Sequence, residues 1–207
     1  GIDGIAGTQA LMVAAFGGWL LLVVGSMELA ILCFLLAASV AGFLIWNWEP
    51  AKIFMGDVGS VFLGYIFAML AIVCESQGSI PLVIWMVILG VFIIDATLTL
   101  IRRIIQGEEW GKPHRTHVYQ LAVQYGFKHK QVVIGVALIN IILFTLAYLM
   151  LLLNNVMFLI GLGTFALLII LYLVLYRRFA DHVSKRKEQG SLGKISLLND
   201  EAAASKE

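Results

Sequence analysis

The chain has 207 residues, of which 61% are hydrophobic and only 13% are charged, and its net charge is +1. The mean hydropathy is +0.95. A soluble domain of average composition carries about 25% charged residues, so these values exclude an ordinary soluble protein and predict a polytopic membrane protein. Both cysteines, Cys33 and Cys74, lie in apolar runs and are interpreted as small hydrophobic residues, not as a disulfide or metal pair.

Six apolar segments follow one another, and most approach the length of about 20 residues that a membrane-spanning helix needs. They cover residues 8–24, 29–46, 61–73, 80–101, 132–153 and 156–176. The predicted fold class is therefore an all-α polytopic membrane protein with about six transmembrane helices and with polar motifs in its loops. The start, residues 1–7, resembles the middle of a loop and lacks an initiator Met, so we expect a longer protein upstream.

The polar loop 47–60 separates the second and third apolar segments. Its proline, glycines, lysine and acids would be costly in hydrocarbon, so the loop is expected at a membrane surface. The turn Gly56-Asp57-Val58-Gly59-Ser60 leads into an apolar helix and offers a carboxylate, a hydroxyl and backbone N–H groups. This combination suits a metal ion and phosphate oxygens, although a plain helix cap explains it equally well.

All 14 Lys and Arg residues lie in the loop 47–60, in the loop 102–131 or in the tail from residue 177. The short turns 25–28, 75–79 and 154–155 hold none. Six crossings place the chain start, both larger loops and the tail on one side, and the positive-inside rule makes that side cytoplasmic. We therefore predict that the polar motifs open on one cytoplasmic face and converge there.

Asp95 lies inside the fourth apolar segment, where an acid is costly and usually faces protein or water. One interpretation is an ion pair, within its helix with Arg102 or with another helix. The other interpretation is that Arg102 or Arg103 contacts a phosphate and that Asp95 is the partner of that arginine.

In the basic loop, His114, Arg115 and His117 suit hydrogen bonds to phosphate oxygens better than a zinc site, because no cysteine or third histidine is near. His129 is expected to be solvated. Asp3 and Asp57 lie on the same face as this loop, and acids beside basic groups fit Mg²⁺ with a pyrophosphate.

Three motifs together resemble the polyprenyl-phosphate N-acetylhexosamine-1-phosphate transferases: GIDGIAG (1–7), PAKIFMGDVGSVFLG (50–64) and KPHRTHVYQ (112–120). The resemblance implies transfer of a sugar-1-phosphate from a UDP-N-acetylhexosamine to undecaprenyl phosphate, with Mg²⁺ (Mn²⁺ as the alternative) as cofactor. It implies that Asp57 is the catalytic and metal-binding acid. The implied substrate-binding residues are Asp3, Asn47, Phe54, His114, Arg115 and His117, with Arg102 and Arg103 added on the reasoning above.

The H-R-x-H form of the histidine motif resembles the branch that initiates O-antigen-like surface polysaccharides. We expect a multi-pass protein of the bacterial inner membrane, with the lipid bilayer as its partner. No nucleic-acid partner is expected, and whether the protein forms a homodimer is left open. Residues 1–177 would form the membrane transferase domain and 178–207 a partly disordered cytoplasmic tail.

The family's earlier acidic motif and further spans are absent from this sequence, so the chain alone is expected to be inactive. The alternatives are a transporter fragment, with Asp95 on the ion pathway, and a non-catalytic membrane subunit.

Overall fold

The structure, a computed structural model, describes residues 2–109 and 115–204, and every regular element in this part is helical. This confirms the all-α class. The helices are α1 (Ile5–Val23), α2 (Met27–Asn47), α3 (Gly56–Ser76), α4 (Leu82–Ile88), α5 (Gly90–Ile105), α6 (Val118–Tyr125), α7 (His129–Leu152), a 3₁₀ turn η1 (Asn154–Val156) and α8 (Met157–Ala204).

Five helices of the described part are long and apolar enough to cross a membrane, namely α1, α2, α3, α7 and α8. The pair α4–α5 adds a sixth span if the two helices are counted as one. Each of the six predicted apolar segments thus corresponds to a helix or to this pair. The third begins at Gly56 and ends at Ser76, so it is longer at both ends than the apolar run alone predicted.

The fourth apolar segment, expected as one span over 80–101, is broken in the structure. α4 ends at Ile88, α5 begins at Gly90, and the two helix axes differ by 79°. Sharp kinks occur at residues such as glycine, and at Gly90 a Cβ atom would lie 2.8 Å from Leu168 Cδ1 of α8. The glycine therefore lets α8 approach the bend closely.

The core is formed by α1 and α2, which pack along their length, together with α4 and the inner faces of α7 and α8. Trp85 of α4 is almost fully buried, and its ring covers Gly17 of α1. A buried polar contact joins α7 to α1 inside this apolar interior: Asn140 Nδ2 donates a hydrogen bond to Gln9 Oε1 at 2.6 Å. Such contacts between membrane helices help to set their register.

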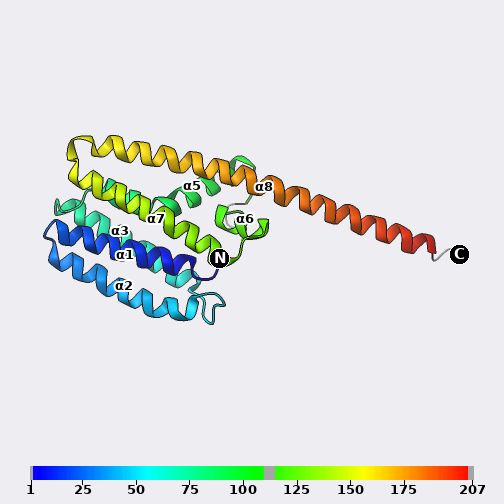
Figure 1. Ribbon diagram of the computed structural model, residues 1–207, viewed down its shortest axis with the longest axis horizontal. Helices are drawn as coiled ribbons and strands as arrows, with labels where there is room; N and C mark the ends of the chain where they lie inside the picture. The colour runs from blue at the N-terminus through cyan, green and yellow to red at the C-terminus, as the bar shows by residue number, and fades with distance from the viewer. Residues whose placement is uncertain (1, 110–114, 205–207) are drawn as a thin grey trace.

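α8 continues to Ala204 and projects beyond the bundle (Figure 1). Its backbone is helical where the sequence predicted a partly disordered tail. The short helix α6 packs on the side of α8, and Leu121, Ala122 and Phe179 form a small apolar cluster between them. The division of the chain at residue 177 stays a prediction.

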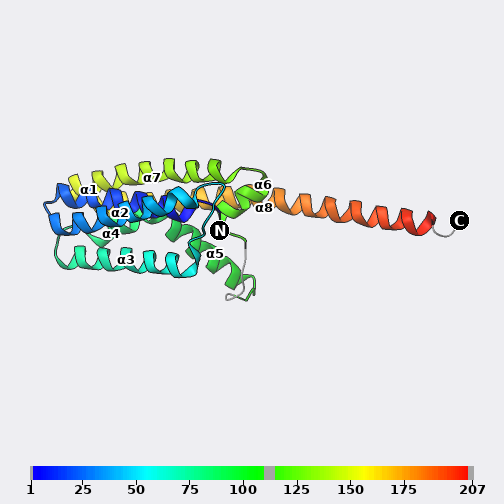
Figure 2. The same ribbon diagram turned by 90° about the horizontal axis from the view of Figure 1, so that it is seen from below.

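The motif-bearing segments gather at one end of the bundle. Figures 1 and 2 show the chain start, the loop after α2 and helix α6 at the end from which α8 projects. The short turns that follow α1, α3 and α7 lie at the opposite end. This is the arrangement that the six-span topology predicted.

Candidate active site

Asn47, the last residue of α2, joins the start of the chain to the loop that follows α2. Its side chain is buried, its Oδ1 accepts the Gly4 N–H at 3.2 Å, and its Nδ2 donates to the Ile53 carbonyl at 2.8 Å. Asp3 adds a second link, because its Oδ2 accepts the Ala51 N–H at 3.2 Å. Asp3 and Asn47, both predicted from sequence, are therefore brought together.

His129, which the sequence predicted to be solvated, belongs to this cluster instead. Its Nδ1 lies 3.3 Å from the Asp3 backbone nitrogen and 3.6 Å from Asp3 Oδ2. The adjacent Lys130 N–H donates to Glu49 Oε2 at 2.8 Å. The start of α7 thus fixes both the chain start and the loop after α2. Sequence reasoning missed His129 because 126 positions separate it from Asp3 and no motif contains it.

Asp57 lies in the first turn of α3, and its side chain is exposed. Gly56 precedes it with a φ of +64°, a conformation that residues with a Cβ rarely adopt. Asp57 also borders a shallow groove along α3, with Val58, Val61, Phe62 and Tyr65. Phe54, in the loop before α3, is 77% exposed, so its ring is open to stacking.

The described residues contain no group of three His, Cys, Asp or Glu side chains placed to hold a metal ion. Mg²⁺ keeps several water ligands and is usually bound through one or two protein carboxylates together with substrate phosphates. The exposed Asp57 carboxylate fits this kind of site as a single protein ligand. It does not fit a metal centre built from the protein alone.

His117 and Asp95 form a second cluster, between α5 and the start of α6. Asp95 Oδ2 lies 3.0 Å from His117 Nδ1, and Asp95 Oδ1 accepts the Val118 N–H at 2.9 Å. The His117 ring stacks on Tyr119, with centroids 5.3 Å apart. Burial, together with the charge of Asp95, raises the pKa of the Tyr119 phenol to about 12, so the phenol is neutral at physiological pH.

The ion pair considered for Asp95 within its own helix, with Arg102, is replaced by other contacts, whereas the contact with His117 is of the kind considered with another helix. Arg102 donates to Tyr172 Oη and to the Thr116 carbonyl, both at 3.1 Å, and its guanidinium lies 3.9 Å from the centroid of the Tyr176 ring. These contacts attach the end of α5 to α8 and to the segment before α6.

Arg103 is 3% exposed and binds Glu108 Oε2 at 2.8 Å and the Glu109 carbonyl at 2.7 Å. Both Arg102 and Arg103 therefore shape the end of α5, and their role at a phosphate stays a prediction. Arg115 is exposed, and its carbonyl accepts a hydrogen bond from Gln124. His114 lies outside the described residues.

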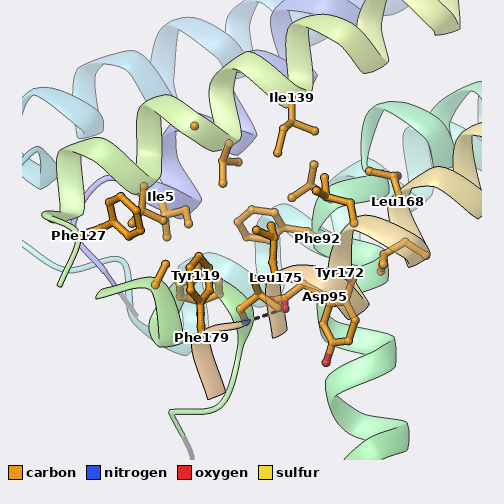
Figure 3. Close-up of a pocket in the computed structure, with 18 of the residues that line it drawn as sticks. Ile5, Phe92, Asp95, Tyr119, Phe127, Ile139, Leu168, Tyr172, Leu175 and Phe179 are labelled. Carbon is orange, nitrogen blue, oxygen red and sulfur yellow. Dashed lines mark hydrogen bonds between the residues drawn. The ribbon is translucent and has the colours of Figure 1, made fainter. Parts of the chain in front are cut away.

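An apolar cavity of about 300 Å³ lies beside the second cluster, between α5, α6, α7 and α8. Figure 3 shows Phe92, Tyr119, Phe127 and Phe179 around it, with the Asp95 carboxylate at its edge. The sequence did not predict this cavity, because its walls come from helices that are distant along the chain.

Fold and site together define an all-helical membrane protein that gathers carboxylates, imidazoles and arginines at one end of its bundle. Residues 1–75 match the family described as Glycosyl transferase family 4. The chain is 36% identical over 150 residues to a "Probable undecaprenyl-phosphate N-acetylglucosaminyl 1-phosphate transferase" of Bacillus subtilis (strain 168), covering 69% of this chain and 40% of the relative.

Two further relatives are each named "Phospho-N-acetylmuramoyl-pentapeptide-transferase". That of Geobacillus sp. (strain WCH70) is 39% identical, over 54% of this chain and 33% of its own length. That of Clostridium perfringens (strain 13 / Type A) is 31% identical, over 72% of this chain and 45% of its own length. The chain thus spans less than half the length of these relatives. No solved structure matches the chain.

These matches confirm the resemblance that the three motifs carried. Over the part that it shares with these proteins, the chain is similar to the polyprenyl-phosphate N-acetylhexosamine-1-phosphate transferases.

Proposed function

We propose that this chain takes part in transferring an N-acetylhexosamine-1-phosphate from a UDP-sugar to undecaprenyl phosphate at the cytoplasmic face of a bacterial inner membrane. The observation that carries the proposal is structural. Four segments lie at one end of one bundle (Figure 2): the chain start, the end of α2, the start of α3 and the start of α6. They carry Asp3, Asn47, Asp57 and His117, the motif residues that resemble the family's donor and phosphate site. The relatives' printed names give the class of reaction.

The donor nucleotide is assigned to the loop between α2 and α3. The ring of Phe54, at 77% exposure, is available to stack on uracil. Asn47 and Asp3 hold this loop through their contacts with Gly4, Ile53 and Ala51. They therefore set the position of Phe54 whether or not they also contact the nucleoside.

The phosphates are assigned to the region between the start of α3 and the start of α6. Phosphoryl transfer depends chiefly on placing the reactants and neutralising charge. His117 and the exposed Arg115 supply donors from one side, and His114 is proposed to act with them. Asp57 would hold Mg²⁺ (or Mn²⁺), and that ion would neutralise the charge of the diphosphate when bound.

The acceptor lipid reaches the site from the membrane. The apolar cavity beside Asp95 opens near the same end of the bundle and has the chemistry to hold part of an isoprenoid chain. Initiation of an O-antigen-like polysaccharide and inactivity of the chain by itself remain predictions.

The transporter alternative relied on Asp95 as an acid on an ion pathway. In the structure both oxygens of Asp95 contact the start of α6, which gives this acid another role. Mg²⁺-dependent binding of a UDP-sugar distinguishes the enzyme from a non-catalytic subunit, because only the enzyme requires it.

Asp57→Asn in the complete enzyme tests the proposal. Loss of the carboxylate removes the proposed metal ligand, and kcat for release of UMP from a UDP-N-acetylhexosamine should fall by about 10²–10³-fold or more. The measurement is UMP release with undecaprenyl phosphate in detergent or nanodiscs.

The matched control is Glu28→Gln, which changes the acid in the first turn of α2 at the opposite end of the bundle. It should leave the rate unchanged. Near-normal turnover by a folded Asp57→Asn enzyme would refute the role of Asp57.

A further inference from the structure

One arginine in the last turn of α5 joins three parts of the motif-bearing end of the bundle. Arg102 donates from Nη1 to Tyr172 Oη of α8 and from Nη2 to the Thr116 carbonyl, both at 3.1 Å. Its Cζ also lies 3.9 Å from the centroid of the Tyr176 ring. The two terminal nitrogens of one planar group thus connect α8 to the segment before α6.

Tyr172 and Tyr176 give Arg102 a firm attachment on α8. Tyr172 is only 6% exposed, and its ring lies parallel to that of Tyr176, with an interplanar angle of 7° and centroids 6.1 Å apart. A guanidinium suits this place because it is planar, stacks on aromatic faces and presents its N–H groups in a fixed fork. An ammonium group donates from a single nitrogen and cannot make the same set of contacts.

The carbonyl that Arg102 binds belongs to the histidine motif. Thr116 directly precedes His117, which is assigned above to the phosphates. On the other side of His117, the Val118 N–H donates to Asp95 Oδ1 at 2.9 Å. The two peptide units that flank the His117 Cα are therefore each held by a side chain of α5.

The two holding side chains share one helix. Asp95 and Arg102 are seven residues apart, so they lie two turns apart on nearly the same face of α5. Figure 3 shows Asp95 and Tyr172, the partner of Arg102, both lining the cavity. One helix thus holds both ends of the short segment 116–118, and it does so through backbone atoms of that segment.

We propose that Arg102 is a positioning residue for the histidine motif. Together with Tyr172 and Tyr176, it fixes the segment 116–118 against α8 before the diphosphate of a sugar nucleotide binds. Preorganised groups of this kind need little rearrangement as charge develops. Arg102 acts through the Thr116 carbonyl and not by contact with a phosphate. The inference rests on the proposed function for its substrate, whereas the hold on the segment can be measured without turnover.

Three variants separate this role from a direct contact with a phosphate. Arg102→Gln removes the guanidinium, and Arg102→Lys keeps the positive charge without the two-nitrogen contact. Tyr172→Phe removes only the hydroxyl that Arg102 binds and keeps the ring beside Tyr176. A role of the charge at a phosphate predicts that Arg102→Lys retains most of the rate and that Tyr172→Phe has little effect. Positioning predicts a loss in all three.

The first experiment measures the hold on the segment in the 207-residue chain in nanodiscs. Spin labels are attached to Arg115→Cys, just before the segment, and to Ser39→Cys on α2, both exposed positions. The native Cys33 and Cys74 are buried and should stay unlabelled. Pulsed electron paramagnetic resonance then gives the distribution of the distance between the labels.

We expect one narrow distance distribution in the parent chain. Arg102→Gln and Arg102→Lys should broaden or shift it, and Tyr172→Phe should do so to a smaller extent. A broad distribution in the parent chain, or an unchanged one in Arg102→Gln, would overturn the proposal. If the Arg102 variants do not fold, an unchanged distribution in Tyr172→Phe overturns it instead.

The second experiment measures kinetics in the complete enzyme. Because a misplacement of about 1 Å can cost about 100-fold in rate, Arg102→Gln and Arg102→Lys should lower kcat for UMP release by about 10–100-fold. Tyr172→Phe should lower it by about 3–10-fold, as expected for one lost hydrogen bond. KM for undecaprenyl phosphate should stay near the parent value in each variant.

A double-mutant cycle tests whether the two residues act together. In an Arg102→Gln background, Tyr172→Phe should cause little further loss of kcat, since the contact that it removes is already gone. A full additional loss there would show that Arg102 does not act through its attachment to α8, and would overturn the proposal.

The matched control is Thr99→Val. Thr99 Oγ1 is buried and lies 3.1 Å from the same Tyr172 hydroxyl. An arginine N–H can only donate, so the hydroxyl oxygen accepts from Arg102 and its proton is available to Thr99. Thr99→Val removes a buried hydrogen bond of the same length and keeps the contact with Arg102. It should lower Tm and leave the distance distribution and kcat as in the parent.

A loss of kcat in Thr99→Val equal to that in Tyr172→Phe would assign the effect to the stability of the α5–α8 packing and overturn the proposal. If the parent enzyme shows no UDP-sugar-dependent transfer, the proposed function fails. The distance measurement still decides whether Arg102 positions the segment 116–118.

Discussion

A single side chain, Asn47, organises the loop on which the proposed nucleotide site depends. Its buried amide uses the oxygen for Gly4 and the nitrogen for Ile53, so it joins the chain start to the segment after α2. Through Asp3, the same unit also contacts Ala51 and His129. Asn47 and Asp3 thus link the chain start, the loop after α2 and the start of α7 to one another. These links determine which part of the loop is exposed.

Asn47→Ala should therefore destabilise the protein. It leaves the Gly4 N–H and the Ile53 carbonyl without their partner in a buried setting, at a cost of about 1–3 kcal/mol. The expected result is a lower Tm in detergent and weaker binding of a UDP-sugar.

Ser39→Ala is the control for Asn47→Ala, because it removes an exposed side-chain hydrogen bond to the Leu35 carbonyl of the same helix. It should leave Tm within experimental scatter. An unchanged Tm in Asn47→Ala would show that the loop is held without this amide.

At the scale of elements, the break between α4 and α5 has the largest consequence. α4 remains in the core, with Ile84, Trp85 and Val87 buried. The axis of α5 is turned by 79° from that of α4, so α5 runs obliquely to the bundle (Figure 2). A straight helix over the same residues would continue in the direction of α4. The bend instead places Asp95 where it contacts the start of α6, and the end of α5 where Arg102 contacts α8.

The position of α4 depends on a close contact with α1. A Cβ atom on Gly17 would lie 2.7 Å from Trp85 Cη2, and the Trp85 side chain is almost completely buried. Gly17→Ala should thus lower the free energy of unfolding by about 1–3 kcal/mol through overpacking, measured as a lower Tm of the purified chain.

Gly42→Ala supplies the comparison for Gly17→Ala. Gly42 lies within α2 and a Cβ there meets nothing within 4 Å, so the same change should be neutral or should raise stability by up to about 1 kcal/mol. Equal effects of the two substitutions would contradict the packing of Trp85 against Gly17.

In the whole molecule, the motif-bearing segments lie at one end and short turns lie at the other. The described helices leave many large apolar side chains exposed, for example Phe62 on α3, Ile142 on α7 and Phe158 on α8. Such surfaces belong in hydrocarbon. The charged loops and the projecting part of α8 lie together beyond one end of this apolar region (Figure 1), and the excess of Lys and Arg predicts that this end faces the cytoplasm.

Cysteine labelling tests this orientation. Gln77 is exposed in the turn after α3, and Ser184 is exposed on the projecting part of α8. A membrane-impermeant maleimide should label Gln77→Cys in intact spheroplasts and Ser184→Cys only after permeabilisation. The native Cys33 and Cys74 are buried and should give little background. The opposite labelling pattern would reverse the assigned topology.

Composition and hydropathy by themselves determined the class, the number of spans and the shared side of the loops, because membrane thickness and charge placement act on each segment separately. The motifs also predicted that Asp3, Asn47, Asp57 and His117 belong to one functional region, and their role stays a prediction. The break after Ile88, the pairing of Asp95 with His117 and the contact between Asp3 and His129 were decided only in three dimensions. Membrane helices are apolar on most sides, so no polar stripe in the sequence indicates which helix will lie against which. The partner of a buried acid is set by that packing, and here the packing selected an imidazole 22 residues away in place of the arginine on the same helix.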